Sequence, residues 1–244
     1  KFMAWAGSFT RLTGPLGFLS LIPSMFAMKR YMRTQLDTVR RDGGDGLIAE
    51  LVRVEREGGR ISRDEMVATL FLLLFAGHET TTHLISGSVH ELLKNPGLRD
   101  RLEQDWSRAN LAVEEFLRFL TPVQFTKPRF VRKDVELGGV PLKKGEKVMA
   151  MLAAGNLDPQ ANICPEKLDL ERKPNRHIAF GTGIHFCLGH QLARLEGICA
   201  LKALFRRWPK LALAVEESEI RWRRRPGFKA IERLPVEAGT QSGP

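Results

Sequence analysis

Apolar residues recur every three or four positions through the first half of the chain, which is the spacing of a helix with one buried face. Glycine and proline residues interrupt this pattern and mark where each helix ends, as Gly43-Gly44 does. The pattern predicts helices at about residues 23–41, 45–57, 98–103 and 107–120. Helices are therefore expected to dominate this part of the fold.

One predicted helix is much longer than the others. It begins at Ser62, where Glu65 three residues later completes a capping box. It extends to about Lys94, where Asn95-Pro96-Gly97 ends it. Its middle, residues 70–76, is apolar on all sides, and such a helix is predicted to run through the protein interior.

The second half of the chain changes character. Short strands are predicted between residues 129 and 149, with tight turns at Gly138-Gly139 and at Lys144-Gly145. Residues 155–186 carry few periodic signals. The remaining predicted elements are a helix at about 188–208 and strands near 211–215, 220–223 and 232–236. The expected fold class is mainly α with small β sheets.

Composition is that of a globular protein, with 244 residues, 43% hydrophobic and 27% charged. The longest apolar run, residues 66–77, is too short to span a bilayer, and no signal peptide is recognisable. The chain starts at Lys1, so the natural N-terminus is expected to lie elsewhere. Three cysteines are too few for a disulfide framework. A cytoplasmic protein without a transmembrane segment is expected.

The net charge of +10 would suit an acidic partner such as a nucleic acid. The basic residues are spread along the chain, however, and the one dense run, residues 221–225, alternates like a strand with a solvated side. No nucleic-acid recognition motif accompanies this charge, so nucleic acid is not an expected partner.

Residues 75–84 resemble a zinc-protease helix at first sight. A chelating pair needs two histidines four residues apart, whereas His78 and His83 are five apart and their rings point roughly 140° away from each other. This stretch is not expected to bind zinc. A second zinc hypothesis remains open, because one more group has suitable residue types without the usual ligand spacing. Its members are Cys164, His177, His185 and Cys187.

The most informative motif is F-G-T-G-I-H-F-C-L-G at residues 180–189, which we call the cysteine loop. Its glycines let the backbone turn tightly and approach a bound group closely. Cys187 lies near the start of the last predicted helix, whose partial positive charge favours a thiolate. The alternative is that Cys187 is only a small buried hydrophobic residue.

The cysteine loop matches the haem-binding loop of the cytochrome P450 monooxygenases, F-G-x-G-x-[HR]-x-C-x-G, at every specified position. The chain therefore resembles this family, but only over the family's C-terminal part. The resemblance implies that part of the cytochrome P450 fold, as one haem-thiolate domain at residues 1–239 before a disordered tail at 240–244. It also implies an N-terminal region that is truncated here or supplied by a second chain or copy.

The resemblance also explains the zinc-like stretch. Residues 76–80, A-G-H-E-T, match the family's [AG]-G-x-[DE]-T motif on its long central helix. The small residues Ala76 and Gly77 are implied to leave room for dioxygen, and Glu79 and Thr80 are implied to deliver protons. Threonine suits this role because its hydroxyl can bond a carbonyl one turn back or, where the helix is distorted, a ligand or water.

Further site residues are implied by the same resemblance. Cys187 would be the thiolate ligand of the iron in haem b, and His185 and Arg129 would bind the haem propionates. The other implied haem contacts are Phe180, Gly181, Gly183, Gly189, Ala76 and Gly77. Candidate substrate contacts, which could equally be core residues, are Phe75, Val123, Phe125 and Phe228.

Glu115 and Arg118 match the family's E-x-x-R motif, which the resemblance implies is an internal, structural ion pair. The family usually adds an arginine from a P-x-R-F segment. Lys167 stands at that position here, and lysine lacks the bidentate fork of arginine. His177 is expected to be structural, and Arg194 fits the helix that follows the cysteine.

The implied function is a haem-thiolate monooxygenase that inserts one oxygen atom from dioxygen into an apolar small molecule. Electrons would come from NAD(P)H through a separate ferredoxin or flavoprotein reductase. This partner would dock on a basic surface that includes Arg194, Lys202, Arg206 and Arg207. The alternatives are a haem-free truncated remnant that acts as a binding or assembly module, and the zinc protein described above.

Overall fold

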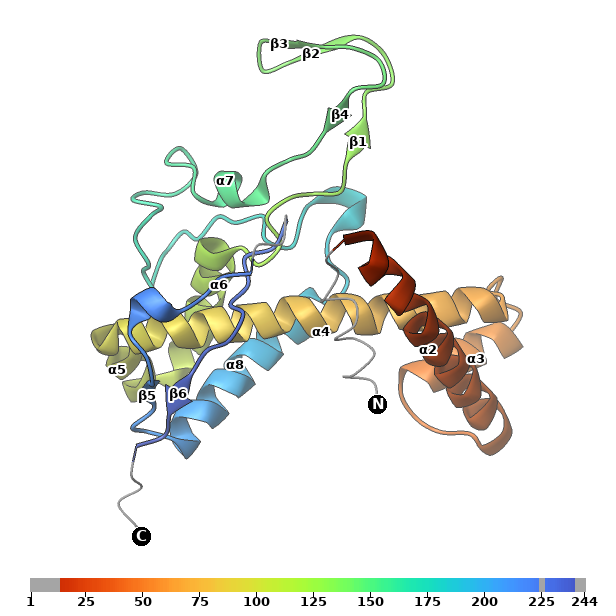
Figure 1. Ribbon diagram of the computed structural model, residues 1–244, viewed down its shortest axis with the longest axis horizontal. Coiled ribbons are helices and arrows are strands. Elements are labelled where there is room, and N and C mark those ends of the chain that lie inside the picture. The colour runs from red at the N-terminus through yellow and green to blue at the C-terminus, as the bar shows by residue number, and fades with distance from the viewer. Residues whose placement is uncertain (1–13, 224–226, 240–244) are drawn as a thin grey trace. The chain divides into compact units, whose positions relative to one another are not determined.

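The computed structural model describes residues 14–223 and 227–239 (Figure 1). The chain divides into two compact units, Lys1–His78 and Glu79–Pro244, and the division falls within a single helix, α4 (Arg63–Lys94). Each unit is described by itself below. The predicted disordered tail at residues 240–244 lies outside the described residues.

In the first unit, α2 (Gly14–Asp42) and α3 (Leu47–Arg56) pack with the first half of α4. The predicted helices at 23–41 and 45–57 are confirmed, although α2 starts earlier and runs through Pro23. The core of this unit consists of apolar residues from all three helices, and within α2 and α4 these residues recur on one face, as the periodicity predicted. These are Met28, Met32, Leu36, Val52, Met66, Val67 and Leu70.

The start of α4 forms the predicted capping box. The Ser62 amide donates to the Glu65 carboxylate at 2.7 Å, and the Glu65 amide donates to Ser62 Oγ at 3.3 Å. These two bonds satisfy amides that have no partner within the helix, and they define where α4 begins.

Ser62→Ala is expected to lower the free energy of unfolding by about 1 kcal/mol, because the Glu65 amide loses its capping acceptor. Urea unfolding followed by circular dichroism measures this loss. Ser62→Thr keeps the hydroxyl and is the matched control. Equal stability of the alanine and threonine variants would show that the cap contributes nothing.

The middle of α4 departs from the prediction. The helix is continuous from Arg63 to Lys94, as expected, but Leu72 is 62% exposed and Leu74 is 41% exposed. The prediction of a buried helix at residues 70–76 was therefore wrong. An apolar helix is buried only where other elements cover every side of it. In the described part of the chain, Leu70 and Phe71 face a core, whereas Leu72 and Leu74 do not.

In the second unit, the rest of α4 packs with α5 (Pro96–Gln104), α6 (Ala109–Leu120) and α8 (His190–Arg207) around one apolar core. The 3₁₀ turn η1 (Trp106–Arg108) leads into α6. Gly87 allows α4 and α6 to approach closely, because a Cβ there would lie 2.9 Å from the Leu120 side chain. The predicted helices at 98–103, 107–120 and 188–208 are thus confirmed within a few residues.

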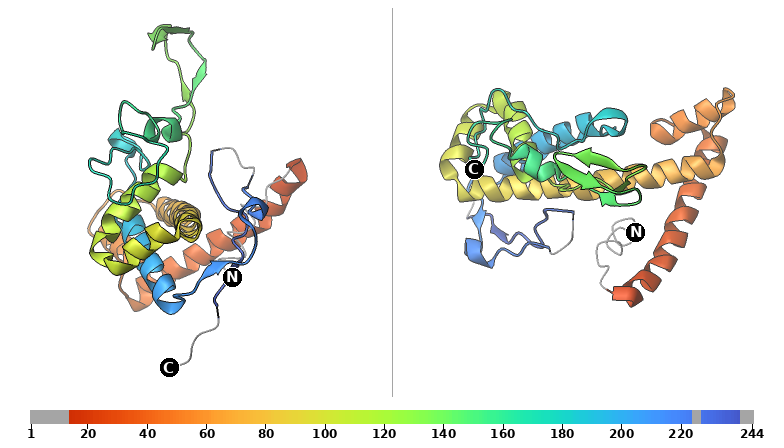
Figure 2. Two further views of the ribbon diagram at one scale, coloured as in Figure 1. Left: turned by 90° about the vertical axis from the view of Figure 1, so that its left-hand side faces the viewer. Right: turned by 90° about the horizontal axis from the view of Figure 1, so that it is seen from above.

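Within the described residues, the strands form three two-stranded antiparallel sheets. The pairs are β1 (Arg129–Phe130) with β4 (Lys147–Val148), β2 (Val135–Leu137) with β3 (Val140–Leu142), and β5 (Ala212–Leu213) with β6 (Val236–Glu237). Gly138 and Gly139 have φ of 57° and 80° and form the predicted turn between β2 and β3. This hairpin projects away from the helices of its unit (Figure 2).

Two short elements differ from the prediction. The strand expected at 220–223 is reduced to an isolated bridge between Trp222 and Ile231, which follows the 3₁₀ turn η3 (Glu217–Glu219). The five-residue helix α7 (Leu152–Asn156) was not predicted, since it is too short to show helical periodicity. Among the described residues, no helix combines the length and apolarity that crossing a membrane requires.

Candidate active site at the cysteine loop

Backbone hydrogen bonds close the cysteine loop. The Cys187 amide donates to the Phe180 carbonyl at 2.9 Å, and the Phe186 amide donates to the Gly183 carbonyl at 3.0 Å. Gly181 and Gly183 have φ of 72° and 67°, a left-handed conformation that favours glycine. The short turn η2 (Gly183–His185) begins at the second of these glycines. These bonds hold Cys187 in a fixed position relative to Phe180.

Cys187 lies just before the start of α8. Its carbonyl accepts the His190 amide at 3.3 Å, and Gly189 is the N-cap residue. The first amides of a helix carry partial positive charge, so this position suits an anionic sulfur. The thiol is free and partly exposed. Cys187 can therefore act as a ligand from the end of a rigid helix.

The surface around Cys187 is open and apolar. Ile184 is 98% exposed and Leu188 is 83% exposed. A Cβ added at Gly183 or Gly189 would meet nothing within 4 Å. Exposed apolar side chains, bare glycine backbone and one sulfur ligand are what a large, flat, apolar group such as haem requires. The residues present fit that group.

The two predicted propionate ligands lie on separate elements. Arg129 is at the start of β1 and His185 at the end of η2, and both are exposed. Within the described residues, no side-chain hydrogen bond or ion pair engages either group. Each is therefore available to a carboxylate of a bound molecule.

Glu79 and His83 are neighbours one turn apart on α4. Glu79 Oε1 lies 3.6 Å from His83 Nε2, and both side chains are buried. This distance is typical of an ion pair and is too long for a direct hydrogen bond. From the sequence, His83 was weighed only as a zinc ligand, and its place beside Glu79 was not predicted. The spacing of four residues was the signal that could have revealed it.

Other predicted residues are distributed over both units. Ala76, Gly77 and Phe75 belong to the first unit, where the Phe75 ring stacks on Phe71 at 6.1 Å and a Cβ at Gly77 would meet nothing within 4 Å. In the second unit, a β-bridge brings together Val123 and Phe228, two of the candidate substrate contacts.

The remaining candidate substrate contact, Phe125, forms a β-bridge with Met151. The Phe228 ring also meets His83 edge-on at 6.3 Å, so this candidate contact lies next to the partner of Glu79.

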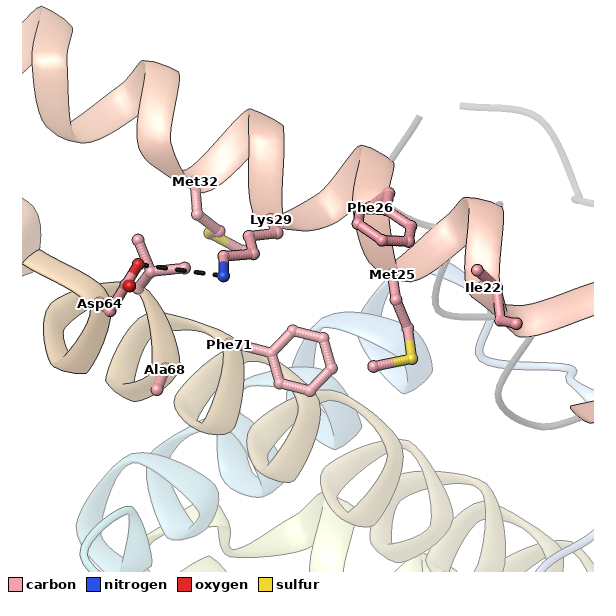
Figure 3. A pocket seen from close by; sticks show the side chains of 9 residues that line it. Ile22, Met25, Phe26, Lys29, Met32, Asp64, Ala68 and Phe71 are labelled. Atoms are coloured by element: carbon pink, nitrogen blue, oxygen red, sulfur yellow. Dashed lines mark ion pairs between the residues drawn. The ribbon is translucent and has the colours of Figure 1, made fainter. Parts of the chain in front are cut away.

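A separate apolar cavity of about 430 Å³ lies within the first unit, between α2 and α4 (Figure 3). Met25, Phe26 and Phe71 line it, and the Lys29 and Asp64 ion pair, with a distance of 3.9 Å, lies at its edge. None of the predicted site residues contributes to its wall.

Glu115 and Arg118 form a fully buried pair on α6. The two guanidinium nitrogens donate to the two carboxylate oxygens at 2.7 and 2.8 Å, and both side chains are 0% exposed. Arg118 also donates to the carbonyls of Asn156 at 3.0 Å and Pro165 at 2.7 Å. This arginine therefore ties α6 to the irregular segment before the cysteine loop.

The third member of this network is Arg172, not the residue at position 167. Arg172 Nε donates to both Glu115 oxygens at 3.1 Å, and its side chain is 8% exposed. Lys167 contributes only its backbone carbonyl, which accepts from Arg172 at 2.8 Å. Arg172 was not predicted as a member of this network, because only position 167 corresponds to the arginine of the family's P-x-R-F segment. No local pattern distinguishes Arg172 from other arginines of the chain.

Arg194 was predicted to contribute to the docking surface for the electron donor. Its guanidinium donates to Glu114 Oε2 at 2.9 Å, so its charge is already paired. Lys202, Arg206 and Arg207 lie further along α8. The zinc hypothesis also lacks support, because within the described residues no group of three histidine, cysteine or acidic side chains could hold a metal ion.

A scan against models of protein families matches cytochrome P450 over residues 24–213. The chain belongs to the cytochrome P450 family. Membership agrees with the predicted resemblance and implies a haem iron.

Several named proteins are similar to this cytochrome P450 chain. The vitamin D(3) 25-hydroxylase of Pseudonocardia autotrophica is 43% identical over 220 residues, which cover 90% of this chain and 55% of that protein. The polyketide biosynthesis cytochrome P450 PksS of Bacillus subtilis (strain 168) is 41% identical, over 79% of this chain and 47% of its own.

The solved structure of PksS superposes with a TM-score of 0.91 at 35% identity, covering 98% of this chain and 61% of that one. The predicted fold class, mainly α with small sheets in the manner of cytochrome P450, is therefore confirmed. The chain spans about half the length of the curated relatives it matches.

Proposed function

We propose that this chain carries the haem-ligand part of a monooxygenase that inserts one oxygen atom from dioxygen into an apolar small molecule. The observation that carries the proposal is a free cysteine at the start of α8, in a hydrogen-bonded loop with bare glycines, in a cytochrome P450 chain. When bound, haem b supplies the activation of dioxygen and the redox chemistry of the reaction.

The residues of the cysteine loop would hold that group. Cys187 binds the iron through its thiolate, and the glycine backbone lets the loop lie against the ring. His185 and Arg129, both exposed and without a side-chain partner among the described residues, bind the propionates by charge-assisted hydrogen bonds. Ala76 and Gly77 are the small residues of the A-G-H-E-T motif and are proposed to leave room for dioxygen.

Glu79 and Thr80 would deliver protons. The buried Glu79 carboxyl next to His83 accepts a proton at Oε1 and passes it toward the Thr80 hydroxyl, which donates its own proton onward. A buried carboxyl beside an imidazole suits this exchange, because each of the two side chains can accept and donate a proton.

Thr80→Val is expected to lower the rate of product formation about 100-fold, because the branched side chain keeps its shape but loses the hydroxyl. Haem content should stay that of the parent chain. Thr80→Ser retains a hydroxyl and is the matched control. Product formation by the valine variant at the parental rate would exclude a proton-delivering role for Thr80.

The proposed substrate is apolar. Phe75, Val123, Phe125 and Phe228 are apolar candidates for its contacts. Similar proteins support this class of substrate. They include a vitamin D(3) 25-hydroxylase, a steroid C26-monooxygenase and a cytochrome P450 whose structure was solved in complex with myristic acid.

The proposed electron donor is a ferredoxin or flavoprotein reductase that receives electrons from NAD(P)H. Lys202, Arg206 and Arg207 provide positive charge on α8 for such a partner. We further propose a cytoplasmic location and one haem-thiolate domain over residues 1–239, completed by a second chain or copy if the 244 residues alone do not retain haem.

Incubation with haem, a ferredoxin, its reductase, NAD(P)H and isotopically labelled dioxygen tests the proposal. Mass spectrometry of a fatty acid and a steroid substrate is expected to show product with one labelled oxygen atom. The proposal would be contradicted by a chain that folds stably but takes up no haem, either alone or with the N-terminal part of the family supplied as a second chain. That result would favour a haem-free binding or assembly module.

A further inference from the structure

Glu114 connects three segments around the cysteine loop. It lies on α6 next to Glu115, yet its carboxylate engages a different set of partners. Glu114 Oε2 lies 2.8 Å from His177 Nε2 and accepts Arg194 Nη2 at 2.9 Å, while Arg194 Nε donates to the other oxygen. His177 precedes the loop and Arg194 follows it, so one carboxylate holds both flanks.

The contacts continue from Arg194 into the loop itself. Its guanidinium lies over the Phe180 ring, 4.6 Å from the centroid, and its Nη1 lies 2.7 Å from Nδ1 of His190. The His190 ring in turn packs on Phe186 with centroids 4.8 Å apart. Because Phe180 accepts the Cys187 amide and Phe186 precedes that cysteine, the chain of contacts ends at Cys187.

Electrostatics favour the charged form of Glu114. Burial is the largest single influence and opposes ionisation, but the hydrogen bonds and charges of His177 and Arg194 outweigh it and lower the pKa of Glu114 from 4.5 to about 2. Because the pKa is lowered on folding, the stabilisation is complete above about pH 4.5 and is lost as pH falls through about 2.

We infer that Glu114 is a positioning residue for Cys187, which it holds through His177 and Arg194 without touching the sulfur. The adjacent Glu115 anchors a different segment through Arg118 and Arg172, so two neighbouring carboxylates on α6 fix two separate parts of the chain. What the sulfur binds depends on the proposed function, whereas the ordering of the loop does not.

Amide hydrogen exchange of the haem-free chain tests this ordering directly. In Glu114→Gln, the amides of Cys187 and Phe186 are expected to exchange about fivefold faster, because local opening of the loop becomes easier. The urea midpoint should fall, because the ionised Glu114 stabilises the folded chain, but the slowest amides of α6 should accelerate less than those of the loop. Glu171→Gln is the control, since it removes a carboxylate whose pair with Arg108 is 54% exposed on both sides.

A second variant separates the route from a general loss of structure. Arg194→Met should speed the same amides by a similar factor, and the double variant should add little, because both substitutions interrupt one path. Unchanged exchange of the Cys187 amide in Glu114→Gln would overturn the inference. Equal acceleration throughout α6 would also overturn it, since the effect would then be global.

The haem-loaded chain provides an independent readout. Glu114→Gln is expected to lower the share of thiolate-type absorption in the reduced, carbon-monoxide-treated protein, with Glu171→Gln at the parental share. An unchanged share in Glu114→Gln would overturn the inference for the loaded form. If the parent chain takes up no haem, either alone or with the N-terminal part of the family supplied as a second chain, the proposed function fails, and the exchange measurement alone decides the role of Glu114.

Discussion

Cys187→Ser is expected to reduce the haem retained per chain at least about tenfold and to abolish oxygen insertion. Serine is nearly the same size as cysteine, but its hydroxyl is not ionised near neutral pH and does not bind iron as a thiolate does. The loop should still close, because its hydrogen bonds involve only backbone atoms. The expected effect therefore lies in the ligand and not in the fold.

Iron and haem analysis after gel filtration measures this effect, with circular dichroism to verify that the variant folds. Cys199→Ser is the matched control, because this exposed cysteine lies on α8 itself and its thiol, like that of Cys187, is free. Cys199→Ser should retain the parental haem content. A Cys187→Ser chain with the iron content and visible spectrum of the parent would show that another residue binds the iron.

Arg118→Met is expected to destabilise the chain by about 3–5 kcal/mol, the largest effect on stability predicted here. Methionine fills part of the space but leaves Glu115 as a buried charge that has lost its bidentate partner. It also removes the donor to the carbonyls of Asn156 and Pro165. Arg172 can neutralise part of the remaining charge on Glu115. Among the described residues, however, Arg172 donates no hydrogen bond to the carbonyl of Asn156 or Pro165.

Urea unfolding of the parent and variant chains measures the loss. Arg108→Met is the control, because Arg108 pairs with Glu171 at a site where both side chains are 54% exposed. Exposed pairs of this kind contribute about 0–1 kcal/mol. If Arg118→Met and Arg108→Met unfold at the same urea concentration, the buried network is not a main source of stability.

Much of the fold could be predicted from local signals. The start of α4 followed from the spacing of Ser62 and Glu65, and the β2–β3 turn followed from two adjacent glycines. Such elements depend on residues that are close in sequence, so their chemistry is visible in a short window. The helix α7 is too short for periodicity and was missed for that reason.

Burial and distant partners could not be predicted in the same way. The exposure of Leu72 depends on which elements cover α4, and an apolar segment does not contain that information. Arg172 binds Glu115 across 57 positions of sequence, and Arg194 binds Glu114 across 80. Only the folded chain shows which arginine of many reaches which carboxylate.

The candidate site shows the same division. The cysteine loop was recognisable because its glycines and cysteine lie within ten residues. The pairing of Glu79 with His83 had a local signal, the spacing of one helical turn, but only the spacing of His78 and His83 was considered, as a test for zinc. The roles of Glu79, Thr80, Arg129 and His185 stay predictions, and Thr80→Val tests that of Thr80.

The absorption difference spectrum of the reduced 244-residue chain, with and without carbon monoxide, tests most directly whether Cys187 binds haem iron as a thiolate. The expected result is a thiolate-type band whose intensity follows the iron content and which Cys187→Ser abolishes. Bound haem without that band, or the same band in Cys187→Ser, would contradict the assignment.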